Sequence, residues 1–383
     1  MNNTVKLIGG IIVLVLIVWG ITAFTNPSGA PVSETGPIKI GFIGPLSGDA
    51  AVYGETEKNA VEIALEEINQ SGELKRRLEV IYEDGKCSGK DAVTAAQKLI
   101  NIDKVSIIFG GVCSSETLGL APVVESNKVV LFSAFSSSPL ISQSGDYVFR
   151  NSPSDSDFGK ADAELIASQG IKRVAMISEN SDYSQGVRGV MKNILQQKNI
   201  ELVSDEVFNS GTKDFRTNLT KIKSANPEAI YVNSGTSPAI AGSIPKQIGE
   251  LGIKNVKIFG NFMLGDKEAL SVGGQAMEGV IFSDARDLTQ SAGSLIEKYK
   301  SKFQKDPAHN YPMAARYDSV YIIKDAIKSC GGDDSNCIKK YLYGMPEYSG
   351  TIGIYRFDSN GDLSSDQFAV HKKIVNGKAV EIK

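Results

Sequence analysis

The stretch FGGVCSSETLGL places a cysteine and two serines at the end of an apolar run, where a nucleophile could stand. A hydrolase elbow of the form G-x-S-x-G needs a glycine two residues before the nucleophile and another two residues after it. Gly111 precedes Cys113 by two, but Ser115 occupies the place of the second glycine. A nucleophile also needs a general base, and neither His309 nor His371 lies in a recognisable triad context. The stretch therefore favours binding over catalysis.

Two groups of hydroxyls follow neighbouring predicted strands. Ser114 and Ser115 come after VSIIFG and open the predicted helix ETLGLAPVVES, and SAFSSSP comes after VVLFS. A helix N-terminus has free N–H groups and a partial positive charge, which suit a carboxylate. A serine there can instead cap the helix, and we prefer that interpretation for Ser115. Two such groups together indicate a site for a carboxylate.

Phosphate and calcium motifs are not matched. GFIGPLSG departs from G-x-G-x-x-G, and Pro45 lacks an N–H group that such a loop would use. The pattern G-x-x-x-x-G-K-[ST] does not occur in the sequence. DSNGD, residues 358–362, lacks the residue order and the closing Glu of a calcium loop, so it predicts a tight Asn-Gly turn.

Length and composition restrict the class of protein. The chain has 383 residues, more than one compact core usually holds, which favours two lobes. Its net charge is -3 and it contains no basic run, so we expect no nucleic-acid partner.

An uncharged apolar run, LIGGIIVLVLIVWGITAF, occupies residues 7–24. Its 18 residues reach the lower end of the length that spans a bilayer. A signal peptide would need a small-x-small cleavage site, and the candidate SGA is followed by Pro31. We therefore expect a membrane anchor rather than a cleaved signal segment, then a Pro-, Gly- and Ser-rich linker at residues 25–37. The rest of the chain is expected to be extracytoplasmic.

Export affects the interpretation of the cysteines. There are four of them, and an even number outside the cytoplasm favours disulfides. A zinc site would need CxxC pairs or clustered histidines, and the chain has only two histidines. We expect no metal and no cofactor.

Strands and helices alternate from residue 38 onward. IKIGFIG and RVAMIS are short apolar runs, whereas EKNAVEIALEEINQSG and GVRGVMKNILQQK repeat apolar residues at helical spacing. This alternation predicts an α/β fold with two doubly wound parallel sheets, over 38–150 and 154–281. The mostly helical residues 289–343 are expected to pack on the first lobe. Ligands of such sheets bind beyond the carboxyl ends of the strands, where the hydroxyl groups above are found.

Several stretches resemble the branched-chain amino-acid (Leu/Ile/Val-type) solute-binding proteins of ABC transporters. IKIGFIGPLSGDAAVYGETEKNAVEIALEEIN resembles their opening, and YEDGKCSGKDAVTAAQKLI, GGVCSSET and LFSAFSSSPLIS continue the likeness in order. SDYSQG, KDF and SGTIGIYRFDSNGDL extend it, so that it covers residues 38–375. Each motif is weak alone, but their order and spacing are specific.

The resemblance implies a type I periplasmic-binding fold, in which two lobes joined by a three-strand hinge close on the ligand. It implies that residues 38–152 plus 283–365 form lobe 1 and that 153–282 plus 366–383 form lobe 2. It also implies a disulfide between Cys87 and Cys113, at the rim of the cleft. We expect a second bridge between the remaining cysteines, Cys330 and Cys337.

The resemblance also implies roles for individual residues. Ser114 and Ser137 would hold the ligand carboxylate, and the carbonyl of Ser136 would accept from its amine. Tyr53 and Tyr183 would line the pocket from the two lobes, while Cys113 would stand at its rim.

One position departs from the family. The second-lobe acid that binds the amine in the family's amino-acid binders falls here on Phe262, in GNFMLGD. Asp266, Asp284 and Glu179 lie near predicted strand ends. A buried ammonium without an acid is costly. Either one of these acids replaces the missing one, or the ligand has no α-amine.

These features predict an extracytoplasmic solute-binding protein that delivers an amino acid or a related small carboxylate to an ABC permease. We expect a monomer that catalyses nothing. The alternative is a ligand-sensing ectodomain of the same fold, which would work with a separate signalling partner.

Overall fold

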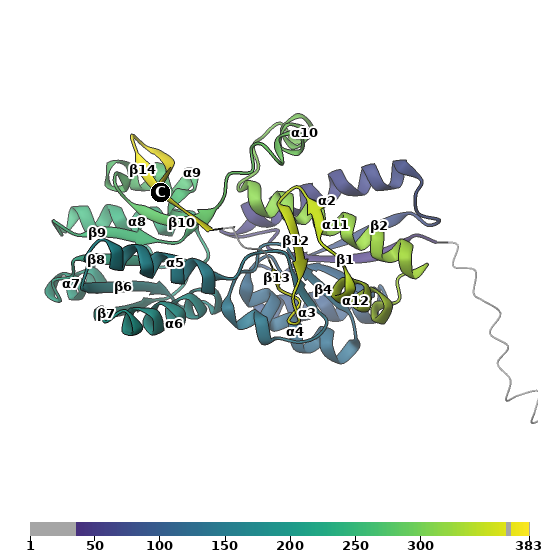
Figure 1. Cartoon of the computed structure of the whole chain (residues 1–383), viewed down its shortest axis with the longest axis horizontal. Coiled ribbons are helices and arrows are strands. Elements are labelled where there is room, and N and C mark those ends of the chain that lie inside the picture. Colours follow the sequence, from purple (N-terminus) through teal and green to yellow (C-terminus); the bar gives the residue numbers. More distant parts are fainter. Residues whose placement is uncertain (1–35, 365–368, 383) are drawn as a thin grey trace, which may run out of the picture. The chain divides into compact units, whose positions relative to one another are not determined.

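The computed structural model describes residues 36–364 and 369–382 (Figure 1). The described residues from Pro37 onward belong to one compact unit. The predicted anchor at residues 7–24 lies outside the described residues, as does most of the predicted linker. Within the described part of the chain, no helix is long and apolar enough to cross a membrane.

The first lobe contains a five-stranded sheet in the order β2-β1-β3-β4-β5, with all neighbours parallel. Its strands are β1 (Ile38–Gly44), β2 (Leu78–Asp84), β3 (Ile107–Gly110), β4 (Val130–Ser133) and β5 (Val148–Arg150). The connecting helices are α2 (Ala51–Ser71), α3 (Gly89–Asn101), α4 (Ser114–Asn127) and the 3-10 helix η1 (Pro139–Gln143). Side chains of β1 enter cores on both faces, Phe42 on one and Ile43 on the other. This confirms a parallel sheet covered on both faces.

The second lobe contains a seven-stranded sheet in the order β15-β14-β10-β9-β8-β6-β7. Its parallel strands are β6 (Arg173–Glu179), β7 (Glu201–Phe208), β8 (Ala229–Asn233), β9 (Lys257–Gly260) and β10 (Ile281–Ala285). Its helices are α5 (Asp155–Ser168), α6 (Asp182–Gln197), α7 (Arg216–Ser224), α8 (Pro238–Glu250) and α9 (Lys267–Gly273), with 3-10 helices η2 (Phe262–Gly265) and η3 (Gly274–Met277). Figure 1 shows these elements in teal and green around the sheet.

One edge of this sheet is antiparallel. β14 (Ala369–Val375) pairs antiparallel with β10, and β15 (Lys378–Ile382) pairs with β14. Asn376 and Gly377 join the two strands at φ values of 51° and 71°, the positive values that a tight hairpin needs. The strand–helix alternation does not predict this hairpin, because no helix separates its strands.

The segment after β10 returns to the first lobe. It contains α10 (Gly293–Phe303), α11 (Asn310–Cys330) and α12 (Ser335–Gly344), then β11 (Tyr348–Gly350), β12 (Gly353–Phe357) and β13 (Leu363–Ser364). α11 lies beside α2 and packs along it (Figure 1). The helical region predicted at 289–343 therefore packs on the first lobe, as expected.

The chain crosses between the lobes after β5, after β10 and between β13 and β14. The last crossing includes residues 365–368, which lie outside the described residues. The lobe bounds given above stay a prediction, and β10, which ends at Ala285, pairs within the second sheet.

Both predicted disulfides are present. Cys87 and Cys113 are bridged with their Cα atoms 5.2 Å apart, and Cys330 and Cys337 are bridged with theirs 5.9 Å apart. The carboxylate of buried Glu116 accepts from the backbone N–H of Cys113 at 2.9 Å and from that of Cys87 at 3.0 Å. Cys113 is therefore a structural staple, fixed to its partner by a covalent bond and a shared acceptor.

Replacing Cys87 and Cys113 by serine is expected to lower the free energy of unfolding by about 3.5 kcal/mol, because the bridge spans 26 residues. The matched double variant at Cys330 and Cys337 opens a span of 7 residues, for which the same chain-entropy relation predicts about 2.4 kcal/mol. Denaturant unfolding of non-reduced protein measures both losses. A larger loss in the second variant would argue against loop closure as the cause.

Candidate ligand-binding cleft

A cavity of about 30 Å³ lies where the carboxyl ends of strands from both sheets meet. From the first lobe it is lined by residues that follow β1, β2, β3 and β4: Ala50, Tyr53, Cys87, Val112, Cys113, Ser114, Ser115, Phe135 and Ser137. From the second lobe it is lined by residues that follow β6, β8 and β9: Ser181, Tyr183, Gly235, Thr236, Phe262 and Met263. This is the location at which open α/β sheets bind ligands.

The two serine-rich stretches predicted in the first lobe, which contain Ser114 and Ser137, both reach this cavity. Ser114 is the first residue of α4, and its Oγ accepts from the backbone N–H of Ser138 at 3.2 Å. Ser137 lies one residue earlier on the loop after β4 and lines the same cavity. Both side chains are buried, with 3% and 7% of their surface exposed. A ligand carboxylate that bound there would be removed from contact with water.

Ser136 faces a different direction. Its hydroxyl donates to the carbonyl of Gly111 at 2.8 Å, and it does not line the cavity. Its own carbonyl lies 3.5 Å from Nη1 of Arg150. The structure thus places its hydroxyl in support of the loop, and its predicted contact with a ligand amine stays a prediction.

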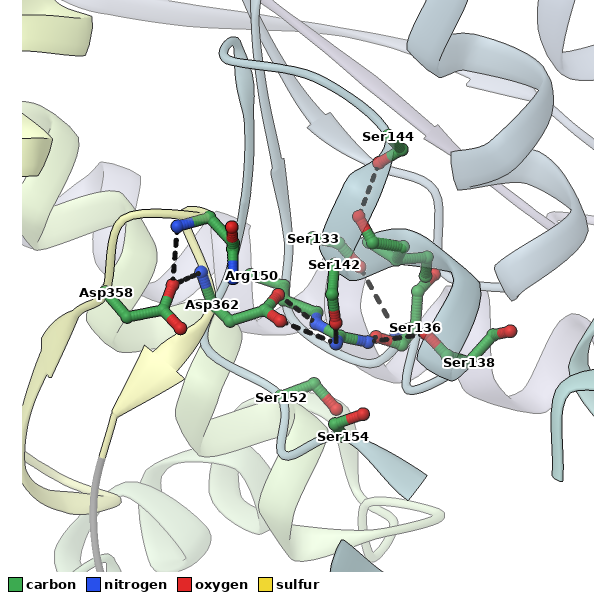
Figure 2. A network of polar contacts seen from close by, with 12 residues as sticks. Ser133, Ser136, Ser138, Ser142, Ser144, Arg150, Ser152, Ser154, Asp358 and Asp362 are labelled. Atoms are coloured by element: carbon green, nitrogen blue, oxygen red, sulfur yellow. Dashed lines mark hydrogen bonds and ion pairs between the residues drawn. The ribbon is translucent and has the colours of Figure 1, made fainter. Parts of the chain in front are cut away.

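Arg150 holds the serine loop through its guanidinium group, whose contacts with Ser138, Ser142 and Asp362 are drawn in Figure 2. Its side chain is fully buried, and Nη1 donates to the carbonyl of Ser138 at 2.8 Å. Nη2 donates to Ser142 Oγ at 3.0 Å. In a two-point ion pair, Nε donates to Oδ1 of Asp362 at 2.6 Å and Nη2 donates to Oδ2 at 3.0 Å. Because Asp362 directly precedes β13, the guanidinium joins the serine loop to the segment between β12 and β13.

Two helices from different lobes begin at the cavity. α4 starts at Ser114, and α6 starts at Asp182 with Ser181 as its N-cap, whose Oγ accepts from the N–H of Ser184 at 3.2 Å. Both N-termini bring partial positive charge. Among the described residues, no Asp, Glu, Lys, Arg or His side chain lines the cavity. Its electrostatics therefore suit an anion held by hydroxyls and helix ends.

Aromatic rings form the apolar part of the cavity. The ring of Phe135 lies 5.1 Å from that of Tyr53 and 5.4 Å from that of Phe262. Phe135 and Tyr53 belong to the first lobe and Phe262 to the second, so the contact between Phe135 and Phe262 crosses the cleft. Burial raises the pKa of both Tyr53 and Tyr183 well above the usual value, which keeps their hydroxyls neutral.

The predicted acids lie outside this cavity. Asp266 accepts from the hydroxyl of Tyr53, and burial raises its pKa to about 6 against the effect of His309. Asp284 binds His309 Nε2 at 3.1 Å and Lys372 Nζ at 2.7 Å. Burial opposes the ionisation of Asp284, but its contacts with His309 and Lys372 outweigh burial and lower its pKa. Both acids border a separate cavity of about 410 Å³.

The carboxylate of Glu179 holds the loop that follows β8 in the second lobe. Its carboxylate accepts from the backbone N–H of Gly235 at 2.7 Å and of Thr236 at 3.0 Å, and from the hydroxyl of Thr236. Gly235 and Thr236 line the ligand cavity, so Glu179 positions its wall and does not face into it.

Three residues near the cavity carry no motif that singles them out in the sequence: Phe135, Arg150 and Asp155. Phe135 lies between two serine positions in SAFSSS, and Arg150 ends β5, where a charged residue after a short apolar run is the only signal in the sequence. Asp155 opens α5 and lines a third cavity of about 30 Å³ together with Phe135, Ser137 and Phe262. Burial raises the pKa of Asp155 to about 7, although Ser137 and Arg150 act in the opposite direction.

Known proteins resemble this chain along nearly all of its described length. A family model described as "periplasmic binding protein" matches residues 37–373. The Leu/Ile/Val-binding protein homolog 3 of Brucella melitensis is 28% identical over 354 residues, covering 91% of this chain and 95% of that protein.

Two solved structures share the fold over both lobes. A leucine-binding protein of Thermotoga maritima has a TM-score of 0.81 at 28% identity and covers 90% of this chain and 98% of its own. A branched-chain amino acid substrate-binding protein of Streptococcus pneumoniae, solved with isoleucine, has a TM-score of 0.78 at 26% identity. It covers 90% of this chain and 100% of its own. These relatives are binding proteins and not enzymes.

Proposed function

The chain belongs to the periplasmic binding protein family, and from that premise we propose that it binds a small carboxylate and delivers it to an ABC permease. Like its relatives it is a binding protein and not an enzyme. The family is extracytoplasmic, and residues 7–24 would tether the chain to the membrane. The protein would act as a monomer, with the permease subunits as its partners.

One observation carries the proposal: the buried hydroxyls of Ser114 and Ser137 share a cavity on which two helix N-termini converge. Hydroxyl and backbone N–H donors are the groups that hold a carboxylate without a counter-charge. The cavity is lined from both lobes, so a ligand there would bind the closed state more tightly than an open one. Such differential affinity drives closure, and closure is what a permease could recognise.

The name of the Brucella relative and the isoleucine of the Streptococcus structure point to amino acids as one ligand class. Phe262 does not fit an amino-acid ligand, because it occupies the position at which the family's amino-acid binders have an acid for the amine. The proposed function therefore covers small carboxylates, with or without an α-amine.

Replacing Ser114 or Ser137 by alanine is expected to weaken carboxylate binding about ten- to a hundredfold, because each removes a hydrogen bond to a charged group, worth about 1.5–3 kcal/mol. The probes are L-leucine and 4-methylpentanoate, chosen by the thermal shift that each produces and measured by titration calorimetry.

Ser144→Ala is the matched control a few residues further along the chain. Its hydroxyl donates to the carbonyl of Ile141 at 2.7 Å and does not line the cavity, so the variant should keep its affinity. If Ser114→Ala only removed a helix cap, it would cost about 1 kcal/mol of stability and leave affinity unchanged. Normal affinity in both the Ser114 and Ser137 variants would overturn the proposed site.

A further inference from the structure

The carboxylate site lacks an acidic partner for an amine. Phe262 stands where the family resemblance expects an acid, and its ring packs 5.4 Å from that of Phe135 and 5.6 Å from that of His309. Among the described residues, the cavity lining includes no Asp or Glu. An ammonium group enclosed there would lose its water without gaining an opposite charge, which is strongly unfavourable.

The acids that could replace the missing one are engaged elsewhere. Asp266 accepts from Tyr53, and Glu179 accepts from the backbone of Gly235 and Thr236. Asp284 is paired with Lys372 and bonded to His309, and its Oδ1 also accepts from the N–H of Ala285 at 2.7 Å. Turning any of them toward the ligand would break these contacts.

Two acids, Asp155 and Asp284, border the neighbouring cavity, which shares Phe135, Ser137 and Phe262 with the ligand cavity. Asp284 is already held by His309 and Lys372, so Asp155 is the more available of the two. One of its carboxylate oxygens has no hydrogen-bond partner among the described residues. It does not line the cavity that contains Ser114, and the rings of Phe135 and Phe262 border both spaces. Asp155 is therefore the residue through which an amine would have to be recognised if the ligand had one.

Building on the proposed function, we infer that the ligand is an apolar monocarboxylate without an α-amine, its body packed against Tyr53, Phe135 and Phe262. The anionic end meets hydroxyls and two helix N-termini, and the apolar end meets three rings, of which Phe135 and Phe262 contact each other across the cleft. Phe262 would act as the specificity determinant, since it replaces a charge that an amino acid needs with a surface that a hydrocarbon body prefers.

Matched ligand pairs test this inference on the wild-type protein. L-Leucine and 4-methylpentanoate share a carbon skeleton and differ by the amine, as do L-phenylalanine and 3-phenylpropanoate. We expect at least one amine-free acid to bind ten or more times more tightly than its amino-acid partner in titration calorimetry.

Phe262→Glu supplies the reverse test. The new carboxylate is expected to weaken binding of the amine-free acid at least tenfold and to improve binding of the matching amino acid. Phe262→Leu is the control, because it keeps an apolar side chain and should keep the preference for the amine-free acid. If the glutamate variant does not fold, the comparison of matched ligand pairs on the wild-type protein still tests the inference.

Three outcomes count against the inference, and they are separable. Tighter binding of the amino acids by the wild type, lost in Asp155→Asn, would overturn it and leave the proposed carboxylate site intact. Equal affinity within each pair would show that the amine is solvated and that Phe262 sets no specificity. Failure of all four compounds to bind would contradict the inference, and failure of a wider panel of small carboxylates as well would overturn the proposed function.

Discussion

Replacing Arg150 by methionine is expected to lower the free energy of unfolding by about 3–5 kcal/mol and to weaken ligand binding in whatever fraction folds. The guanidinium is fully buried, and its loss leaves Asp362 and the carbonyl of Ser138 without their donor. The loop that carries Ser137 would then be free to shift, so the loss of affinity follows from the same cause. Denaturant unfolding and titration calorimetry measure the two effects.

Two further variants separate this role from a general effect of losing an arginine. Arg356→Met, at an exposed position on β12, should change stability by no more than about 0.5 kcal/mol. Arg150→Lys keeps the charge but loses the fork that contacts Asp362 at two points, so it should recover only part of the stability. A loss below about 1 kcal/mol in Arg150→Met would show that the network does not hold the loop.

Breaking the ion pair between Glu57 and Arg316 is expected to cost a similar amount, about 3–5 kcal/mol for either single change. The pair joins α2 to α11, and both side chains are fully buried. Arg316 Nε lies 2.7 Å from Glu57 Oε2, and Nη1 donates to the carbonyl of Phe132 at 2.8 Å. Burial raises the pKa of Glu57 and lowers the pKa of Arg316, while each partner opposes the other's shift. Removal of one partner leaves an uncompensated charge in the core.

A double-mutant cycle of Glu57→Gln, Arg316→Met and their combination measures the coupling. The double variant should be less unstable than the sum of the single variants, because no lone charge remains. Arg188→Met, which breaks the partly exposed pair with Asp205, is the control and should cost no more than about 1 kcal/mol. Additive losses in the cycle would contradict a direct interaction between Glu57 and Arg316.

Local patterns in the chain were enough to predict much of the architecture. Strand and helix periodicity predicts the parallel part of each sheet, because covering both faces imposes continuous apolar strands such as IKIGFIG. The four cysteines, in an exported chain that resembles one family, predict both bridges. The serines after β3 and β4 are visible as candidates because parallel strands end at the same edge of a sheet. The antiparallel hairpin of β14 and β15 is not visible in that alternation.

The amino-acid sequence predicted the fold class and, through its family resemblance, the bridge at Cys113, and it singled out the serine groups as candidates for binding a carboxylate. Only the tertiary structure decided what the charged residues do. Asp284, Glu179 and Asp266 are equivalent candidates in the sequence, but each has a different partner in space, and Arg150 carries no motif at all. The reason is that periodicity and backbone connections act over a few residues, whereas a buried charge depends on partners brought together from distant segments. Arg150 and Asp362 are 212 positions apart in the chain, and Tyr53 and Asp266 are 213 apart, so only folding could assign them to each other.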